Sequence, residues 1–374
     1  MFAHSVRTVR PQGRCGDLAV VFDQHRKFSA IALYDPESAI PLRILHAGKP
    51  VTIDRTWWRT QIHRALQRRE GVASNSTNAY RCVHGESDGL AGLIIDRYDQ
   101  VAVIKIYAGG LVGWIDTIVE LISELDWVTA VVVRWSRELE DRFGDVRTHV
   151  ACGALDSPTV RFLENDVMFE ADVMSGHKTG HFLDQRDNRL RVRKRARDAR
   201  VLDVFSCTGG FTVNAAIGGA RSVTAIDISA PALSALRHNL DLNRANQHLA
   251  RCNVTTTCGD AFVELERLLA ARVAFDLVIL DPPSFANKKT ALVRATQSYA
   301  RLIDLAIKLT DRGGTLVAAS CSSRMPAEHF FDIVRDRLAH ARRSPIRFDT
   351  TFQAPDHPVT FAEGAYLKAA WVTL

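Results

Sequence analysis

The second half of the chain alternates apolar runs with segments of helical periodicity. Runs rich in β-branched and other apolar residues predict strands at residues 201–205, 222–227, 255–258, 275–280 and 314–320. Apolar positions three or four residues apart predict helices at residues 209–216, 230–243, 261–271, 297–309 and 327–341. This alternation is typical of a parallel sheet covered by helices on both faces, so we predict an α/β fold. Two later runs have no long helix between them and predict an antiparallel edge pair, at residues 346–353 and 366–372.

The first half of the chain has a different pattern. Short β-like runs separated by turn-rich segments predict a small β-rich module, with strands at residues 18–23, 30–35 and 40–46. A helical period follows over residues 55–69, with Trp58 and Ile62 on its apolar side. The elements predicted after it are strands at 79–84, 93–98, 101–107 and 128–134, a helix at 114–125, a polar loop at 137–153, and a hairpin of 160–163 with 167–171. We therefore predict three domains, at residues 1–55, 56–173 and 174–374.

Composition narrows the class of protein. The chain has 374 residues, of which 47% are hydrophobic and 24% charged, and this excludes a disordered chain, a collagen-like chain and a small disulfide scaffold. No apolar run approaches the roughly 20 residues of a membrane helix, and residues 1–14 lack the apolar core of a secretory signal. The seven cysteines show no C-x-x-C pair and no zinc-ligand spacing, which predicts reduced thiols in a cytoplasmic protein and no metal site. A net charge of +6 suits a polyanionic partner.

Acidic residues follow three successive predicted strands of the C-terminal half. Asp203 closes a strand and precedes a turn with Gly209 and Gly210, whose backbone amides can approach a ligand closely. Asp227 ends the next strand, where an acid hydrogen-bonds the ribose hydroxyls of a nucleotide-like ligand in doubly wound sheets. Asp260 follows the third strand, where it could meet an adenine edge, although a helix N-cap is the other reading for each single aspartate. Together they predict a ligand site at this edge of the sheet.

Two further strand ends indicate the chemistry. The run Asp281-Pro282-Pro283-Ser284-Phe285 is a rigid turn after a buried strand, because proline fixes the backbone. Cys321 ends the next strand and is predicted to face the same edge as Asp281. A lone cysteine at a strand end is as often structural as functional, but here it joins a row of acids.

The order of these motifs resembles that of class I S-adenosylmethionine-dependent methyltransferases. More closely, the chain resembles the bacterial family of large-subunit ribosomal RNA cytosine-5 methyltransferases. The runs that carry this resemblance are residues 81–97, 175–189, 356–358 and 363–368. The resemblance implies a small β-rich PUA-like domain, a middle α+β domain of EEHEE type and a Rossmann-like catalytic domain.

The resemblance also assigns residues to roles. It implies that Cys321 is the nucleophile, and we take Asp281 as its catalytic partner. The cofactor-binding residues that we predict are Asp203, Phe205, Gly209, Asp227, Ile228, Asp260, Asp281, Lys178, Thr179, Phe182, Gln185 and Arg186. The implied cofactor is S-adenosylmethionine, and the implied partner is large-subunit (23S) ribosomal RNA or its precursor particle, with no membrane partner. Whether the chain forms a homodimer is left open.

The expected reaction is covalent. Addition of a thiolate to C6 of cytosine makes C5 nucleophilic enough to accept a methyl group, after the target base leaves its stack. A cluster of basic residues within 189–200 and the helix at 55–69 predict contacts with RNA phosphates, unless these residues form only a solvated helix face. The sequence leaves two other activities open: methylation of guanine N7 or an exocyclic amine without a thiol, and a non-catalytic role in ribosome assembly.

Overall fold

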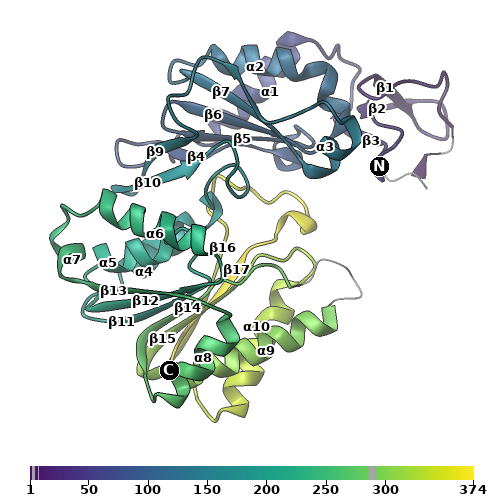
Figure 1. Ribbon diagram of the computed structural model, residues 1–374. Coiled ribbons are helices and arrows are strands. Elements are labelled where there is room, and N and C mark those ends of the chain that lie inside the picture. Colours follow the sequence, from purple (N-terminus) through teal and green to yellow (C-terminus); the bar gives the residue numbers. More distant parts are fainter. Residues whose placement is uncertain (2–4, 7, 286–291) are drawn as a thin grey trace. The chain divides into compact units, whose positions relative to one another are not determined.

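The computed structural model describes residues 1, 5–6, 8–285 and 292–374. They form two compact units (Figure 1). The N-terminal unit comprises Met1–Asp166, Glu170–Leu183 and Pro355–Pro358, and the C-terminal unit comprises Val167–Phe169, Asp184–Ala354 and Val359–Leu374. In the described part of the chain, no helix combines the length and the apolarity needed to cross a membrane.

A seven-stranded sheet forms the centre of the C-terminal unit. Its spatial order is β13-β12-β11-β14-β15-β17-β16. The first five strands in that order run parallel to one another, whereas β17 runs antiparallel to both of its neighbours. In chain order the strands are β11 (Arg200–Val204), β12 (Ser222–Asp227), β13 (Asn253–Cys258), β14 (Phe275–Leu280), β15 (Thr310–Ser320), β16 (Arg347–Phe352) and β17 (Lys368–Thr373). The predicted parallel sheet and its antiparallel edge pair are therefore confirmed.

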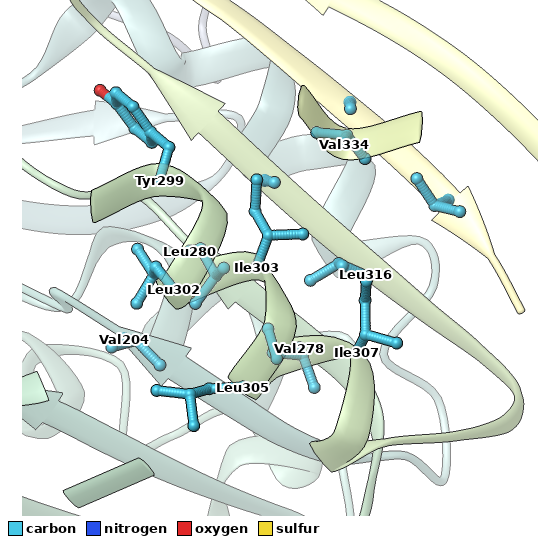
Figure 2. Close-up of a cluster of buried hydrophobic side chains, with 14 of the residues drawn as sticks. Val204, Val278, Leu280, Tyr299, Leu302, Ile303, Leu305, Ile307, Leu316 and Val334 are labelled. Atoms are coloured by element: carbon cyan, nitrogen blue, oxygen red, sulfur yellow. The ribbon is translucent and has the colours of Figure 1, made fainter. Parts of the chain in front are cut away.

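Helices cover both faces of this sheet. One face packs against α4 (Arg186–Arg193), α5 (Gly210–Ile217) and α6 (Ala230–Leu242). The other packs against α8 (Ala261–Ala270), α9 (Leu292–Leu309) and α10 (Ala327–His340), and a short helix, α7 (Gln247–Arg251), precedes β13. Alternate residues of each buried strand serve the two faces: Val278 and Leu280 belong to the core beneath α9, as Figure 2 shows, whereas Leu277 belongs to the opposite core. These two cores fix the strand ends that carry the predicted acids.

The N-terminal unit contains two larger sheets. A three-stranded antiparallel sheet is formed by β1 (Leu18–Phe22), β2 (Phe28–Tyr34) and β3 (Leu42–Ala47). A five-stranded sheet follows the order β4 (Ala79–His84), β5 (Leu93–Tyr98), β6 (Val101–Ile106), β7 (Ala130–Trp135) and β8 (His149–Cys152). The unit also holds α1 (Arg55–Gln67), α2 (Ile115–Ser123) and α3 (Arg137–Phe143), and β9 (Thr159–Glu164) pairs with β10 (Val167–Asp172).

The predicted loop at 137–153 is wrong. It contains the helix α3 and the strand β8. Leu139 is the buried residue of α3, and β8 is an edge strand that pairs only with β7 and alternates exposed with half-buried positions. The helix α3 therefore carries too few apolar residues, and the four-residue strand β8 is too short, to show a periodic pattern in the sequence.

Buried ion pairs hold parts of the N-terminal unit that are far apart in sequence. Arg69 forms a bidentate pair with Asp88, with both oxygens at 2.7 Å, and also donates to the carbonyl oxygen of Asp356 at 3.0 Å. Arg81 pairs with the buried Asp96 and donates its backbone N–H to the Asp356 carboxylate at 2.8 Å. Two of the runs that carried the family resemblance, 81–97 and 356–358, therefore meet in one buried polar network.

Candidate active site

The strand register brings the predicted acids to one edge of the C-terminal sheet. Val204 of β11 pairs with Ile226 on one side and with Leu280 on the other, and Leu280 pairs in turn with Ala318. Because these strands are parallel, the residues that follow them meet at the carboxyl edge. The chain order reverses direction between β11 and β14, and ligands of open α/β sheets bind at such a reversal. Asp203 and Asp281 flank this position.

Asp203 is fully buried at the end of β11. Its Oδ2 accepts a hydrogen bond from the Thr212 hydroxyl at 2.6 Å, and within the described residues its Oδ1 has no hydrogen-bond partner. Burial, together with the nearby carboxylates of Asp281 and Asp227, raises the pKa of Asp203 to about 7, against the lowering effect of hydrogen bonds with Thr212. The site therefore holds a carboxyl group that is ready to accept a hydrogen bond.

The turn after β11 has an unusual backbone. Phe205, Cys207 and Gly209 have φ angles of 65°, 47° and 83°, in the left-handed region that favours glycine. A Cβ at Gly209 would lie 2.5 Å from Cγ of Leu236, so glycine is required there for space as well as for conformation. The strained turn opens α5 and directs backbone groups toward the sheet edge.

Asp227 holds this turn in place. One oxygen accepts from the backbone N–H of Cys207 at 2.9 Å, and the other accepts from that of Ser229 at 2.8 Å. A carboxylate oxygen has more than one lone pair, so both can accept further hydrogen bonds from a ligand. Ile228, directly after it, is 74% exposed, which leaves an apolar side chain uncovered beside the site.

Asp260 has the simpler role that the sequence also allowed. It is the N-cap of α8, where its Oδ1 accepts from the backbone N–H groups of Phe262 and Val263 at 3.0 and 3.1 Å. This is a helix cap of the ordinary kind, and it accounts for the aspartate without a ligand. Its place in the cofactor site remains a prediction.

Cys321 lies beside the Asp-Pro-Pro turn. Its Sγ is 3.8 Å from the carbonyl oxygen of Pro282, the residue after Asp281. The neighbouring Ser320 is fully buried and accepts a hydrogen bond from the Tyr299 hydroxyl of α9 at 2.9 Å. Tyr299 also interacts electrostatically with both Cys321 and Asp281. The predicted nucleophile and its predicted partner therefore lie together.

The remaining predicted residues fall in both units. Gln185 and Arg186 are buried in the C-terminal unit, where Gln185 accepts from Asn188 at 2.6 Å. Lys178, Thr179 and Phe182 belong to the N-terminal unit. There the buried Thr179 hydroxyl donates a hydrogen bond to the Asp96 carboxylate. The Lys178 ammonium lies 4.5 Å from the centroid of the Phe182 ring. Their role in cofactor binding remains a prediction.

The basic run at 189–200 is less available than the sequence suggested. Arg189 is buried, Arg191 pairs with Asp349, and Arg200 forms ion pairs with Asp276 and Asp311 at 3.1 and 2.9 Å. Lys194 and Arg195 remain exposed. Fewer cations are thus available for phosphates than the seven basic residues in the sequence.

Sequence reasoning missed several side chains around the site, including Thr212, Tyr299 and Lys368. Lys368 is fully buried at the start of β17. Two signals could have revealed it: it is a charged residue inside the predicted apolar run 366–372, and it belongs to the run 363–368 that carries the family resemblance. The ring of Phe285 packs edge-on against Tyr299, with centroids 4.9 Å apart.

Comparison with known proteins identifies the family. A family model described as S-adenosylmethionine-dependent methyltransferase matches residues 120–359. The chain belongs to the S-adenosylmethionine-dependent methyltransferases. It is 39% identical to a ribosomal RNA large subunit methyltransferase of Deinococcus radiodurans, over 100% of this chain and 93% of the relative. It is 36% identical to ribosomal RNA large subunit methyltransferase I of Alteromonas mediterranea, over 98% of this chain and 92% of the relative.

A solved structure shares the fold of this methyltransferase. The crystal structure of SMU.776 complexed with SAH superposes with a TM-score of 0.81 at 20% identity, covering 97% of this chain and 93% of that one. At this identity the likeness concerns the fold alone. The predicted α/β methyltransferase fold is confirmed.

The residues at the sheet edge fit the cofactor of this methyltransferase family, S-adenosylmethionine. Among the buried polar atoms that have no hydrogen-bond partner in the described part of the chain are Asp203 Oδ1, Ser206 Oγ and Gln185 Nε2. Buried polar atoms normally find partners, so the two at the end of β11, on Asp203 and Ser206, suit a ligand rich in hydroxyl, amine and carboxylate groups. Gly209 keeps the turn beside them free of a side chain.

Proposed function

We propose that this chain methylates large-subunit ribosomal RNA and forms 5-methylcytosine through a covalent adduct of Cys321. The observation that carries this proposal is the position of the Cys321 thiol, 3.8 Å from the Pro282 carbonyl oxygen at the edge that also carries Asp203 and Asp281. The names of the relatives supply the class of substrate. A thiol at this position has a clear use in C5 chemistry and none in the methylation of an amine.

The thiol solves a problem of reactivity. C5 of cytosine is a poor nucleophile, and addition of the Cys321 thiolate to C6 turns the ring into an enamine-like species whose C5 is electron-rich. When bound, S-adenosylmethionine supplies an electrophilic methyl group. Loss of the C5 proton to a base and departure of the thiolate then restore the aromatic ring and release the sulfur.

Asp281 is the residue that we propose to orient the base. A carboxylate there accepts a hydrogen bond from the exocyclic amine of cytosine, and a protonated carboxyl donates one to N3 as the ring accepts electrons. Either contact requires the target base to leave its stack. The rigid Pro282-Pro283 segment keeps Asp281 at the sheet edge.

The position of Ser284 offers no second thiol for release of the product. Ser284 occupies the position at which many RNA cytosine-5 methyltransferases outside the family that this chain resembles carry a cysteine, in an Asp-x-Pro-Cys turn. A serine hydroxyl is a far weaker acid than a thiol, so we do not assign the C5 deprotonation to it.

We also propose that the N-terminal unit contributes to RNA binding. Residues 1–55 would form the PUA-like domain, which contains the sheet β1-β2-β3. Residues 56–173 would form the EEHEE-type domain, in which β5 and β6 precede α2 and β7 and β8 follow it. Residues 174–374 would form the methyltransferase domain.

The test is replacement of the thiol. Cys321→Ala should abolish 5-methylcytosine in large-subunit ribosomal RNA, measured by nucleoside mass spectrometry after incubation with S-adenosylmethionine. Cys252→Ala, which removes a half-buried cysteine just before β13, at the end of that strand opposite the site, is the matched control and should retain activity.

Three outcomes separate the proposal from its alternatives. Normal 5-methylcytosine formation by Cys321→Ala would exclude the thiol as nucleophile. A methylated guanosine or an N-methylated base made by the wild type would favour the second chemistry. No methyl transfer to RNA of any kind would favour a non-catalytic assembly role.

A further inference from the structure

The Cys321 segment is held from two sides by long side chains. Ser320 and Ser322, which flank the cysteine, are both buried. The Tyr299 hydroxyl of α9 donates to the Ser320 Oγ at 2.9 Å, and the Lys368 ammonium of β17 donates to the carbonyl oxygen of Ser322. Lys368 also pairs in register with Ser320 across the β15–β17 ladder. The nucleophile therefore lies between two anchored residues.

Lys368 is an unusual anchor. The side chain is fully buried, and its Nζ donates only to backbone carbonyl oxygens, those of Ser322 and, at 3.0 Å, Tyr366. In the described part of the chain it forms no ion pair with a carboxylate. Buried lysines are rare unless they are paired with an opposite charge, because removing an ammonium from water is costly. A neutral donor would satisfy the same carbonyl oxygens at a smaller cost.

The electrostatics around Lys368 identify one counter-charge. Burial lowers the pKa of Lys368, interaction with the Cys321 sulfur raises it, and the net result is a pKa of about 8. At pH 7 the group is therefore mostly an ammonium. Two other titratable groups face the thiol. Tyr299 of α9 interacts with it electrostatically, and Asp281 precedes Pro282, whose carbonyl oxygen contacts the sulfur. An ionised Asp281 disfavours the thiolate, because both groups carry a negative charge.

We propose that Lys368 is a positioning residue whose buried ammonium stabilises the thiolate of Cys321 while its hydrogen bond to Ser322 fixes the direction of the sulfur. The inference rests on the proposed role of Cys321 as nucleophile. The thiol gives its proton to solvent, the ammonium keeps its own, and the ion pair that results has no net charge. The thiolate then adds to C6, and Lys368 keeps its charge until the sulfur leaves.

This arrangement answers a general difficulty of thiol nucleophiles. A cysteine of ordinary pKa, about 8.5, is mostly protonated at pH 7, and a neighbouring carboxylate makes ionisation harder. A buried cation on the opposite side offsets that carboxylate. It allows the site to keep Asp281 for contact with the base without losing the thiolate.

Alkylation of Cys321 by iodoacetamide tests the proposal without RNA. Its rate is followed from pH 6 to pH 10 by mass spectrometry of the peptide that contains Cys321, in the wild type, Lys368→Gln, Lys368→Arg and Lys308→Gln. Glutamine keeps an N–H donor for the carbonyl oxygens but removes the charge, arginine keeps the charge, and Lys308 is an exposed lysine of α9 that serves as control.

In Lys368→Gln, Cys321 should be alkylated about tenfold more slowly than in the wild type at pH 7, and its rate should approach the wild-type rate above the thiol pKa. A rise of about one unit in the thiol pKa lowers the thiolate fraction about tenfold. Lys368→Arg and Lys308→Gln should follow the wild-type profile. If the midpoint of the curve of alkylation rate against pH is the same in Lys368→Gln as in the wild type, the proposal is overturned, even if the rate changes by the same factor at every pH. Cofactor affinity of each variant, measured by calorimetry, confirms that the fold is retained.

The same variants separate this inference from the proposed function. If Cys321→Ala still forms 5-methylcytosine while Lys368→Gln shifts the midpoint of alkylation, Cys321 is not the nucleophile, but Lys368 does stabilise its thiolate. If Cys321→Ala is inactive and the midpoint does not move, the nucleophile is right and Lys368 only holds the chain.

Discussion

Asp203 is the residue whose environment differs most from that of an ordinary surface acid. Its burial raises the pKa to about 7 against an ordinary value of 3.8, so that about half of the group is protonated at neutral pH. In the unfolded chain the same group loses its proton near pH 4. Folding therefore binds a proton between these values, and the stability that this proton contributes is complete below about pH 4 and is lost as the pH rises to about 7.

Asp203→Asn should remove this dependence, because an amide of the same shape stays neutral. Without cofactor, the stability of the wild type relative to Asp203→Asn should fall between pH 4.5 and pH 7 by up to about 1.4 kcal/mol per pH unit. Urea unfolding at several pH values measures the difference. A difference that stays constant with pH would show that Asp203 ionises normally in the folded protein.

Asp227→Ala should weaken cofactor binding through the turn that it supports. The substitution removes the acceptor of the Cys207 and Ser229 backbone N–H groups. Hydrogen bonds to a charged group contribute about 1.5–3 kcal/mol, so an affinity loss of about ten- to a hundredfold is expected by calorimetry. Asp198→Ala, at an exposed position, is the control and should bind normally. Unchanged affinity in Asp227→Ala would remove this residue from the site.

The sequence revealed site residues where a local rule applies. Asp203, Asp227, Asp281 and Cys321 each lie at or directly after the carboxyl end of a strand whose apolar pattern is clear, and parallel strands bring such positions to one edge. Residues such as Thr212, Tyr299 and Lys368 act through contacts set by the packing of helices and by the pairing of β15 with β17, and no local pattern encodes those contacts. Asp260 also follows a local rule, because it is the N-cap of α8, and its place in the cofactor site remains a prediction.

At the scale of elements, the turn between β11 and α5 is sensitive to the addition of a single methyl group. Gly209→Ala places a Cβ in the left-handed region and 2.5 Å from Leu236 Cγ. Gly313→Ala has the same conformational strain, with φ at 77°, but meets no atom within 4 Å. The pair of variants therefore separates strain from collision.

Gly313→Ala should cost about 1–2 kcal/mol of stability and leave cofactor affinity unchanged, since strain is its only effect. Gly209→Ala should cost more than this and weaken cofactor binding at least tenfold. Thermal unfolding and calorimetry measure the two quantities. Equal losses in both variants would mean that the turn adjusts around the methyl group.

The elements most clearly predicted were those with both a buried face and an apolar pattern. The strands at 79–84, 93–98, 222–227 and 275–280 have the bounds predicted from the sequence. The prediction fails for elements that are short or carry few apolar residues. The segment predicted as a loop contains α3 and β8, and β15 begins at Thr310, four residues before the predicted start. Edge strands and short helices gain stability from pairing and from ion pairs, which leave no hydrophobic period to find.

At the scale of the whole molecule, the charge of +6 matters for RNA only where cations are exposed. Replacing the exposed Lys194 and Arg195 together with Gln should make the salt dependence of RNA binding shallower, by about 0.7–0.9 in log K against log salt for each lost phosphate contact. Lys308→Gln is the control, and filter binding from low to high salt measures the slopes. A slope equal to that of the wild type would exclude Lys194 and Arg195 from the RNA interface.

The most direct test of the central claim is to trap the adduct on Cys321. Ribosomal RNA that contains 5-fluorocytosine lacks the C5 proton that must leave, so the thiolate cannot be eliminated after methyl transfer. We predict a covalent RNA–protein complex that requires S-adenosylmethionine, is absent in Cys321→Ala, and yields a nucleotide-modified peptide containing Cys321 by mass spectrometry. A modified peptide that contains Cys207 instead, or no complex while the natural RNA is methylated normally, would contradict the account.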